Sequence, residues 1–146
     1  MKNTAEYLKE KGVRPSAQGV AIMKYLMEHK VHPTVDDIYN AILPDMPSLS
    51  KTTVYNVLKH LEEKGALKSL LIDEKNIRYD ADTSSHMHFK CNKCGKLYDL
   101  KQPDFSMLTG TEDFEIKQVH LYCWGICPDC KSEKTSVNED SYNYKQ

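Results

Sequence analysis

Long apolar runs are missing from this sequence of 146 residues. A membrane-spanning helix needs roughly 18 consecutive apolar residues, and no segment approaches that length. The opening residues, MKNTAEYLKEKG, also lack the apolar centre of a secretory signal. We therefore expect a soluble, cytoplasmic protein. Thiols are kept reduced there, so paired cysteines indicate metal or redox chemistry more often than structural disulfides.

Arginine and excess positive charge are scarce as well. Arg14 and Arg78 are the only arginines, and the net charge is −1. Residues 1–70 hold ten Lys/Arg against eight Asp/Glu (+2), and residues 71–146 hold ten against thirteen (−3). Contacts of arginine with guanine, the commonest direct readout of DNA, can therefore be few. A DNA-binding role has to rest on a particular element and not on overall charge.

The first half of the sequence predicts helices. Residues 3–11 form a short amphipathic helix, and a second helix capped by Ser16 runs to about Glu28. Thr34 begins a third helix, and Asp37 three residues later completes a capping box.

A fourth helix is the best defined, with Ser50 as its N-cap and Gly65 as its stop. Its apolar residues recur at helical spacing and are expected to face the core: Val54, Val57, Leu58 and Leu61. Its outer side is polar, aromatic and basic: Ser50, Lys51, Thr52, Tyr55, Asn56 and Lys59. No acidic residue lies between Asp45 and Glu62. Such a face suits a recognition helix in the major groove of DNA.

Two β-like stretches follow, Leu67–Ile72 and Ile77–Asp80, joined by a polar turn at residues 73–76. Three helices followed by a hairpin predict a winged helix-turn-helix. The alternative is a helical module that binds protein instead of DNA.

Beyond Asp80 the sequence is richer in Cys, His and β-favouring residues. It predicts strands over Met87–Leu100 and Glu115–Ile126, and a short helix near Pro103–Leu108. Residues 131–146 are polar and are expected to form a flexible tail. The fold class is therefore α+β, with a winged-helix domain over residues 1–80 and a second, metal-binding domain over residues 84–130.

Two CxxC pairs, Cys91/Cys94 and Cys127/Cys130, are separated by 32 residues. Each pair presents two thiolates from one tight turn, and two such turns together provide the tetrahedral sulfur ligation of structural zinc. A thioredoxin-like redox pair or a disulfide is the alternative, but neither needs a second CxxC. The fifth cysteine, Cys123, belongs to neither pair and is expected to be a small buried hydrophobe.

His86 and His88 stand two residues apart just before the first CxxC pair. On a strand, both imidazoles would point the same way and could face one metal. A pair of histidines in a core without metal is the alternative. His29, His60 and His120 lie outside this pattern and are expected at the surface or in the core.

These motifs together resemble the ferric uptake regulator (Fur) family. The resemblance covers about residues 5–130, and six motifs agree with it in order and spacing. They are Arg14 with Gln18, His32–Tyr39, Thr53–Asn56, Arg78–Asp80, His86–His88 and the two CxxC pairs.

The resemblance implies a winged-helix DNA domain joined to a small α/β dimerisation domain, working as a homodimer on double-stranded operator DNA. It assigns structural zinc to Cys91, Cys94, Cys127 and Cys130. It assigns a regulatory metal to His32, Asp80, His86, His88 and Asp99. Three neutral imidazoles and two carboxylates carry a formal charge of −2, and such mixed nitrogen and oxygen ligation suits Fe²⁺ or Mn²⁺.

An Asp instead of a Glu at position 99 is more typical of the peroxide-sensing (PerR) branch of the family. Two departures from the family pattern stand out. Gly19 occupies a position where the family usually carries an arginine that touches DNA. The segment between the CxxC pairs is also shorter than usual by about one helical turn, so the dimerisation helix is expected to be truncated.

The resulting hypothesis is a metal-dependent repressor, with metal as co-repressor and DNA contacts from Arg14, Gln18 and the outer side of the fourth helix. Peroxide would act through bound Fe²⁺ by oxidising His32 or His86, which would release the metal and the DNA. The alternatives are an iron- or zinc-uptake repressor that senses metal level only, a metal-dependent hydrolase, and a zinc-stabilised protein-interaction module. We expect no enzyme, because no acid or base residue is positioned beyond the ligands.

Overall fold

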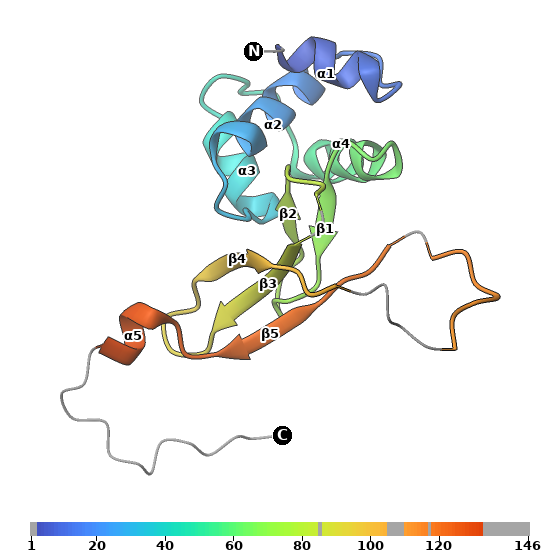
Figure 1. Cartoon of the computed structure of the whole chain (residues 1–146). Coiled ribbons are helices and arrows are strands. Elements are labelled where there is room, and N and C mark those ends of the chain that lie inside the picture. Colours follow the sequence, from blue (N-terminus) through green and yellow to red (C-terminus); the bar gives the residue numbers. More distant parts are fainter. Residues whose placement is uncertain (1–2, 85, 105–109, 117, 133–146) are drawn as a thin grey trace. The chain divides into compact units, whose positions relative to one another are not determined.

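The computed structural model describes residues 3–84, 86–104, 110–116 and 118–132. The chain divides into two compact units, the N-terminal unit (Met1–Ser85) and the C-terminal unit (His86–Gln146). In Figure 1 the first unit contains helices α1–α4 and hairpin β1–β2, and the second contains strands β3–β5 and helix α5. No helix within the described ranges is both long enough and apolar enough to cross a membrane.

The helices of the N-terminal unit begin where the sequence provides a capping side chain. Their bounds are α1 (Thr4–Glu10), α2 (Ala17–Glu28), α3 (Val35–Ile42) and α4 (Lys51–Glu63). Side chains of Asn3, Ser16, Thr34 and Ser50 accept hydrogen bonds from the first turns of these helices, which satisfies backbone donors that have no partner inside the helix. Both hydrogen bonds of the predicted capping box between Thr34 and Asp37 are present.

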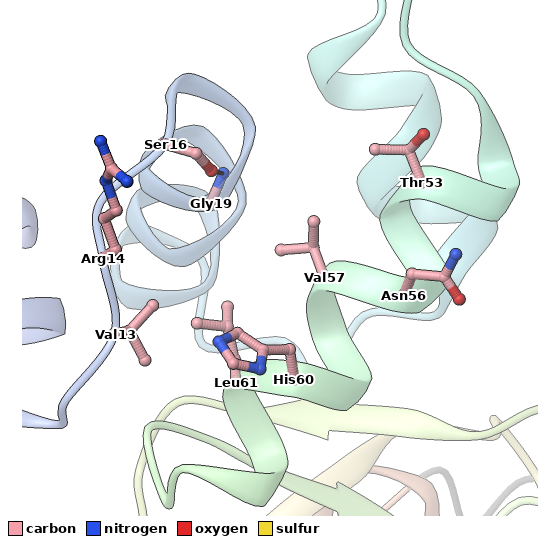
Figure 2. A pocket seen from close by; sticks show the side chains of 9 residues that line it. All are labelled: Val13, Arg14, Ser16, Gly19, Thr53, Asn56, Val57, His60 and Leu61. Atoms are coloured by element: carbon pink, nitrogen blue, oxygen red, sulfur yellow. Dashed lines mark hydrogen bonds between the residues drawn. The ribbon is translucent and has the colours of Figure 1, made fainter.

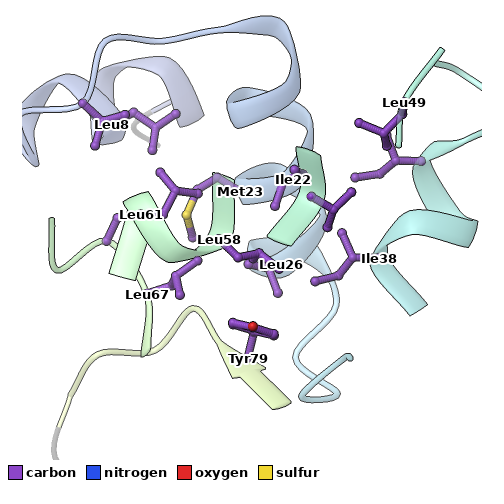
Figure 3. Packing of buried hydrophobic residues seen from close by; sticks show 14 residues of the cluster. Leu8, Ile22, Met23, Leu26, Ile38, Leu49, Leu58, Leu61, Leu67 and Tyr79 are labelled. Atoms are coloured by element: carbon purple, nitrogen blue, oxygen red, sulfur yellow. The ribbon is translucent and has the colours of Figure 1, made fainter. Parts of the chain in front are cut away.

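An apolar core holds the four helices together. Figure 3 shows its packing, in which side chains of α2 and α4 interdigitate and Tyr79 from the hairpin closes one side. The most deeply buried members are Leu8, Ile22, Met23, Leu26, Ile38, Val54, Leu58 and Leu61. Helix α3 packs against α4. Because Val54, Leu58 and Leu61 turn one face of α4 into the core, its outer side faces away from it.

The hairpin is shorter than predicted. Strand β1 (Lys68–Leu70) pairs antiparallel with β2 (Arg78–Asp80), and Ser69 lies opposite Tyr79. The prediction extended both strands further toward the turn. The strands end early because the Asp73 side chain accepts the backbone N–H of Lys75, which bends the chain out of the ladder.

The C-terminal unit contains a three-stranded sheet of order β4-β3-β5. The stretch Met87–Leu100, predicted as β-strand, is strand on either side of the predicted CxxC turn. It is two antiparallel strands, β3 (His86–Cys91) and β4 (Leu97–Lys101), separated by the first CxxC turn. Gly95 has a φ of 75° there and donates its N–H to the Cys91 carbonyl, which reverses the chain.

The last part of the unit also departs from the prediction. Among the described residues of Glu115–Ile126, only β5 (Tyr122–Gly125) is a strand, and it runs parallel to β3. Helix α5 (Pro128–Ser132), which contains the end of the second CxxC pair, was not predicted. Residues 103 and 104 are not helical, and the rest of the helix predicted near Pro103–Leu108 lies outside the described residues. The expected tail overlaps α5 at residues 131–132 and otherwise also lies outside them.

Candidate metal centres and nucleic-acid interface

The four cysteines of the CxxC pairs gather in one cluster of the C-terminal unit, and their sulfur atoms lie within 4.8 Å of one another. The first pair lies in the turn between β3 and β4, and the second lies at the start of α5. The Sγ atoms of Cys94 and Cys127 are 3.8 Å apart. Sulfurs at the corners of a tetrahedron about 2.3 Å from a central zinc ion are separated by about 3.8 Å. The cluster therefore fits a zinc ion, and none of the five cysteines, all within the described ranges, forms a disulfide.

Hydrogen bonds lower the pKa of two of these four thiols, Cys91 and Cys127, which favours their thiolate forms. Burial raises the pKa of the Cys91 thiol, but backbone N–H groups of Cys94 and Cys127 outweigh it and lower the pKa to about 6. The Tyr98 hydroxyl is buried beside Cys127 without a hydrogen bond of ordinary geometry. It nevertheless lowers the pKa of the Cys127 thiol. The hydrogen bond with Cys127, together with burial, raises the pKa of the Cys130 thiol to about 12.

Cys123 lies outside the four-cysteine cluster, as expected. It is half-buried on β5, opposite Phe89 of β3. Its environment is less enclosed than the sequence predicted, because this strand is at an edge of the sheet.

In the N-terminal unit, His32 and Asp80 form one pair of potential metal donors. His32 lies in the loop before α3, and Asp80 is the last residue of β2. The His32 Nε2 and Asp80 Oδ2 atoms are 3.4 Å apart. The second carboxylate oxygen, Oδ1, accepts the backbone N–H of Asp82, which orients the first oxygen toward the imidazole.

In the C-terminal unit, His86, His88 and Asp99 form a second group. His86 and His88 share one face of β3, and Asp99 lies directly opposite His88 on β4. One oxygen of Asp99 lies 3.4 Å from His86 Nε2 and 3.3 Å from His88 Nε2. The register of the two strands therefore brings Asp99 to two histidines that lie more than ten positions earlier in the sequence.

Within each group, the distances between donor atoms suit ligands of a single ion. Ligands bonded at about 2.0–2.2 Å to a metal and separated by 90–109° lie about 3.0–3.5 Å apart. Nitrogen and oxygen donors without sulfur suit Fe²⁺ or Mn²⁺. Each unit by itself offers only part of the five-residue set, two donors in the N-terminal unit and three in the C-terminal unit.

The predicted recognition surface lies on the outer side of α4. All six residues assigned to it are exposed, as are Arg14 and Gln18 near the start of α2. Two of the six have partners within the protein. The Ser50 hydroxyl accepts the N–H of Thr53 as the helix cap, and Lys51 forms an exposed ion pair with Asp36 at 3.1 Å.

A hollow of about 260 Å³ lies between the start of α2 and the outer part of α4. Figure 2 shows Arg14, Ser16 and Gly19 on one side of it, and Thr53, Asn56 and His60 on the other. The sequence predicts DNA contacts for Arg14 and Asn56 but not for His60, which lines the same hollow. The helical spacing of Asn56 and His60, four residues apart, would have suggested that they share a face.

The N-terminal unit has helices that end in a hairpin and exposed polar residues along α4, and the chain carries two kinds of metal-donor cluster. These features are typical of metal-responsive transcriptional regulators. The chain belongs to the ferric uptake regulator family, whose pattern matches residues 10–124.

Individual relatives agree with this assignment. The peroxide-responsive repressor PerR of Staphylococcus epidermidis (strain ATCC 12228 / FDA PCI 1200) is 35% identical over 130 residues, which are 86% of this chain and 87% of that protein. The Campylobacter jejuni peroxide stress regulator superposes with a TM-score of 0.62 at 26% identity, covering 86% of this chain and 94% of that one. The Helicobacter pylori ferric uptake regulator Fur superposes with a TM-score of 0.69 at 20% identity, over 90% and 97% of the two chains, which shows a shared fold.

Proposed function

We propose that this protein is a cytoplasmic, homodimeric repressor that binds operator DNA when a regulatory Fe²⁺ or Mn²⁺ ion is bound, and that peroxide relieves the repression. The observation that carries the proposal is the division of nitrogen and oxygen donors between the two units, each with an incomplete set of suitable spacing. We propose a regulator and not an enzyme, and family membership supports this.

The four-cysteine cluster is assigned a structural role. Cys91, Cys94, Cys127 and Cys130 would complete the coordination of a zinc ion by themselves and leave no open position for a reactant. The ion would join the β3–β4 turn to the start of α5, so it supports the sheet that positions His86, His88 and Asp99. Zinc is thus a structural requirement of the second site.

The five-residue set is assigned the regulatory role. One divalent ion that takes ligands from both units would favour one arrangement of the DNA-binding helices over others. A ligand shifts such an equilibrium only by its difference in affinity for the two states, and ligands drawn from both units provide that difference. In a dimer, the favoured arrangement would place the two α4 helices in successive major grooves of the operator.

Peroxide sensitivity is proposed on the strength of Asp99 and of relatives named as peroxide-responsive repressors. When bound, Fe²⁺ would catalyse a two-electron oxidation by peroxide: the O–O bond breaks, one oxygen enters a C–H bond of an imidazole ring, and the other leaves as water. His32 and His86 are the proposed targets of the oxidation. An imidazole that gains an oxygen atom is a poorer ligand, so the protein would lose metal and then release the operator.

The test compares operator binding by protein loaded with zinc alone, with added Mn²⁺ and with added Fe²⁺, before and after a low dose of peroxide. We expect Mn²⁺ and Fe²⁺ to tighten operator binding. Peroxide should abolish the effect of Fe²⁺ only, with the mass of one oxygen atom added on peptides containing His32 or His86. Equal operator affinity with and without regulatory metal would contradict the proposal.

The second candidate is a repressor that senses metal level only. Membership of the ferric uptake regulator family favours it. It predicts the same metal dependence but no change in mass or operator binding after peroxide, so the same experiment separates the two functions.

A further inference from the structure

The backbone of His32 has an unusual conformation. Its φ is 53°, and it is the only residue other than glycine with a positive φ among the residues that the structure describes. Side chains with a Cβ disfavour this left-handed region, so a single residue stays there only when its surroundings hold it. Of the five proposed ligands of the regulatory metal, His32 is the one that lies in a loop and not in a strand. Its position therefore depends on contacts from elsewhere.

Strand β2 provides those contacts from three consecutive residues. Arg78 Nη1 donates to the His32 carbonyl at 3.4 Å, and the Tyr79 backbone N–H donates to the Pro33 carbonyl at 3.0 Å. Asp80 then places Oδ2 at 3.4 Å from His32 Nε2. Of these three residues, only Arg78 donates a side-chain hydrogen bond to the backbone of His32.

The guanidinium of Arg78 is itself held in place by the hairpin turn. Arg78 Nη2 and Nε both donate to Asp73 Oδ2, at 2.9 and 3.2 Å, and Asp37 at the start of α3 lies 3.9 Å from Nη1. The guanidinium side chain is only 24% exposed. One planar group thus joins the hairpin turn, the His32 loop and α3, which a lysine ammonium would not do with the same geometry.

We propose that Arg78 is a positioning residue for the regulatory metal site, which holds His32 in its ligating conformation and ties that conformation to Asp73 in the hairpin turn. The inference rests on the proposed function, because it takes His32 to be a metal ligand. It makes a specific claim about the scarce arginines of this chain. Arg78 is used inside the N-terminal unit to orient a ligand, and DNA contact by arginine is left to Arg14.

The experiment measures the Mn²⁺ affinity of the full, zinc-loaded chain. We expect Arg78→Ala to weaken Mn²⁺ binding by about 10–100-fold, the usual effect of losing a partner that orients a ligand. Asp73→Asn and Arg78→Lys should weaken it less, in the same direction. Lys75→Ala is the matched control, because it removes a positive charge from the same turn without touching His32, and it should bind Mn²⁺ as the wild type does.

A double-variant comparison separates positioning from general loss of structure. If Arg78 acts through His32, then Arg78→Ala should have little further effect on Mn²⁺ affinity in a His32→Ala background. Zinc content and the melting temperature of each variant are measured in parallel and should stay near the wild-type values. Should Arg78→Ala fail to fold, Arg78→Lys and Asp73→Asn carry the same test.

The outcomes distinguish this inference from the proposed function. If His32→Ala weakens Mn²⁺ binding but none of the Arg78 and Asp73 variants does, the positioning role is wrong and the metal site stands. If the double variant lost Mn²⁺ affinity by the product of the two single-variant factors, the positioning role would also be wrong. If His32→Ala binds Mn²⁺ like the wild type, the regulatory site itself is wrong.

Discussion

The two units of the chain are stabilised by different means. Among the described residues, the buried apolar side chains run from Leu8 to Tyr79 and all belong to the N-terminal unit. The described part of the C-terminal unit adds only Cys91, Cys127 and the polar His88 to the buried residues. One unit therefore folds on a conventional hydrophobic core, whereas the other has a small sheet and a cluster of cysteines where a core would be. A sheet with so little apolar burial needs a metal or a partner subunit for stability.

The difference also concerns function. Capped helices and a closed core give the N-terminal unit a rigid surface along α4, which suits the recognition of DNA. The C-terminal unit depends on its ions, and its stability is thereby linked to metal supply and to the chemical state of its ligands. Five predictions, from the largest expected effect to the smallest, test how independent the two units are.

Removal of zinc should have the largest effect. We expect Cys91→Ser or a strong chelator to unfold the C-terminal unit, because structural zinc contributes about 10–16 kcal/mol to small zinc domains. Trp124, the only tryptophan, lies on β5 and reports on this unit by fluorescence. The helical circular dichroism of the N-terminal unit should remain. Cys123→Ser, on the same strand but outside the cluster, is the control and should keep its zinc.

A cavity in the helical core should destabilise the N-terminal unit and leave the C-terminal unit unchanged. Leu58 is fully buried on α4, and Leu58→Ala should lower the free energy of unfolding of the N-terminal unit by about 2–5 kcal/mol. Urea unfolding followed by circular dichroism measures this, while Trp124 fluorescence and zinc content should not change. Lys59→Ala on the outer side is the matched control for stability. Simultaneous loss of both signals in the wild type would show that the units unfold as one.

Acid should act on the C-terminal unit first. The pKa of Cys91 is lowered from 9.0 to about 6, so its thiolate persists as the pH falls and is lost only near pH 6. The stability that it contributes is therefore present in full above pH 9 and lost as the pH falls through about 6. We expect zinc retention against a competing chelator to drop on the acid side of pH 6. An equal loss of N-terminal helical signal at the same pH would break the comparison.

A change on the recognition surface should affect DNA and leave both metals alone. Lys59→Ala should weaken binding to different DNA sequences nearly uniformly and should reduce the slope of log affinity against log salt by about 1. Gel-shift titration over a range of salt concentrations measures this. The same variant should bind Mn²⁺ and zinc normally, and a loss of either metal would show that the α4 surface is coupled to the C-terminal unit.

The smallest effect is expected at Asp36. Its exposed ion pair with Lys51 competes with any phosphate that approaches that lysine. Exposed pairs of this kind are worth about 0.2–1 kcal/mol, so Asp36→Asn should tighten DNA binding by no more than a few-fold. Asn40→Asp, which adds a negative charge on the same helix where Asp36→Asn removes one, is the control with the opposite change of charge. Weaker binding by Asp36→Asn would show that the pair orients Lys51 instead of restraining it.

Prediction from sequence was most accurate where the signal was local. Ser16, Thr34 and Ser50 cap their helices as expected, and the exposed side of α4 follows from helical periodicity alone. It was less accurate between Met87 and Leu100, where the predicted β range runs through the CxxC turn that separates β3 from β4. The hairpin strands were also placed too long, because an Asp side chain that bonds to the backbone ends a strand without a change in hydrophobic pattern.

The sequence by itself determined the two CxxC pairs, the helix caps and the exposed side of α4, because each depends on side chains only a few positions apart. Tertiary structure alone decided the position of His32, whose left-handed backbone is held by an arginine 46 residues away. It also decided that Asp99 faces both His86 and His88, since strand register sets that pairing. Spacing along a chain specifies what one turn or helix can do, whereas contacts between distant residues exist only after the chain has folded.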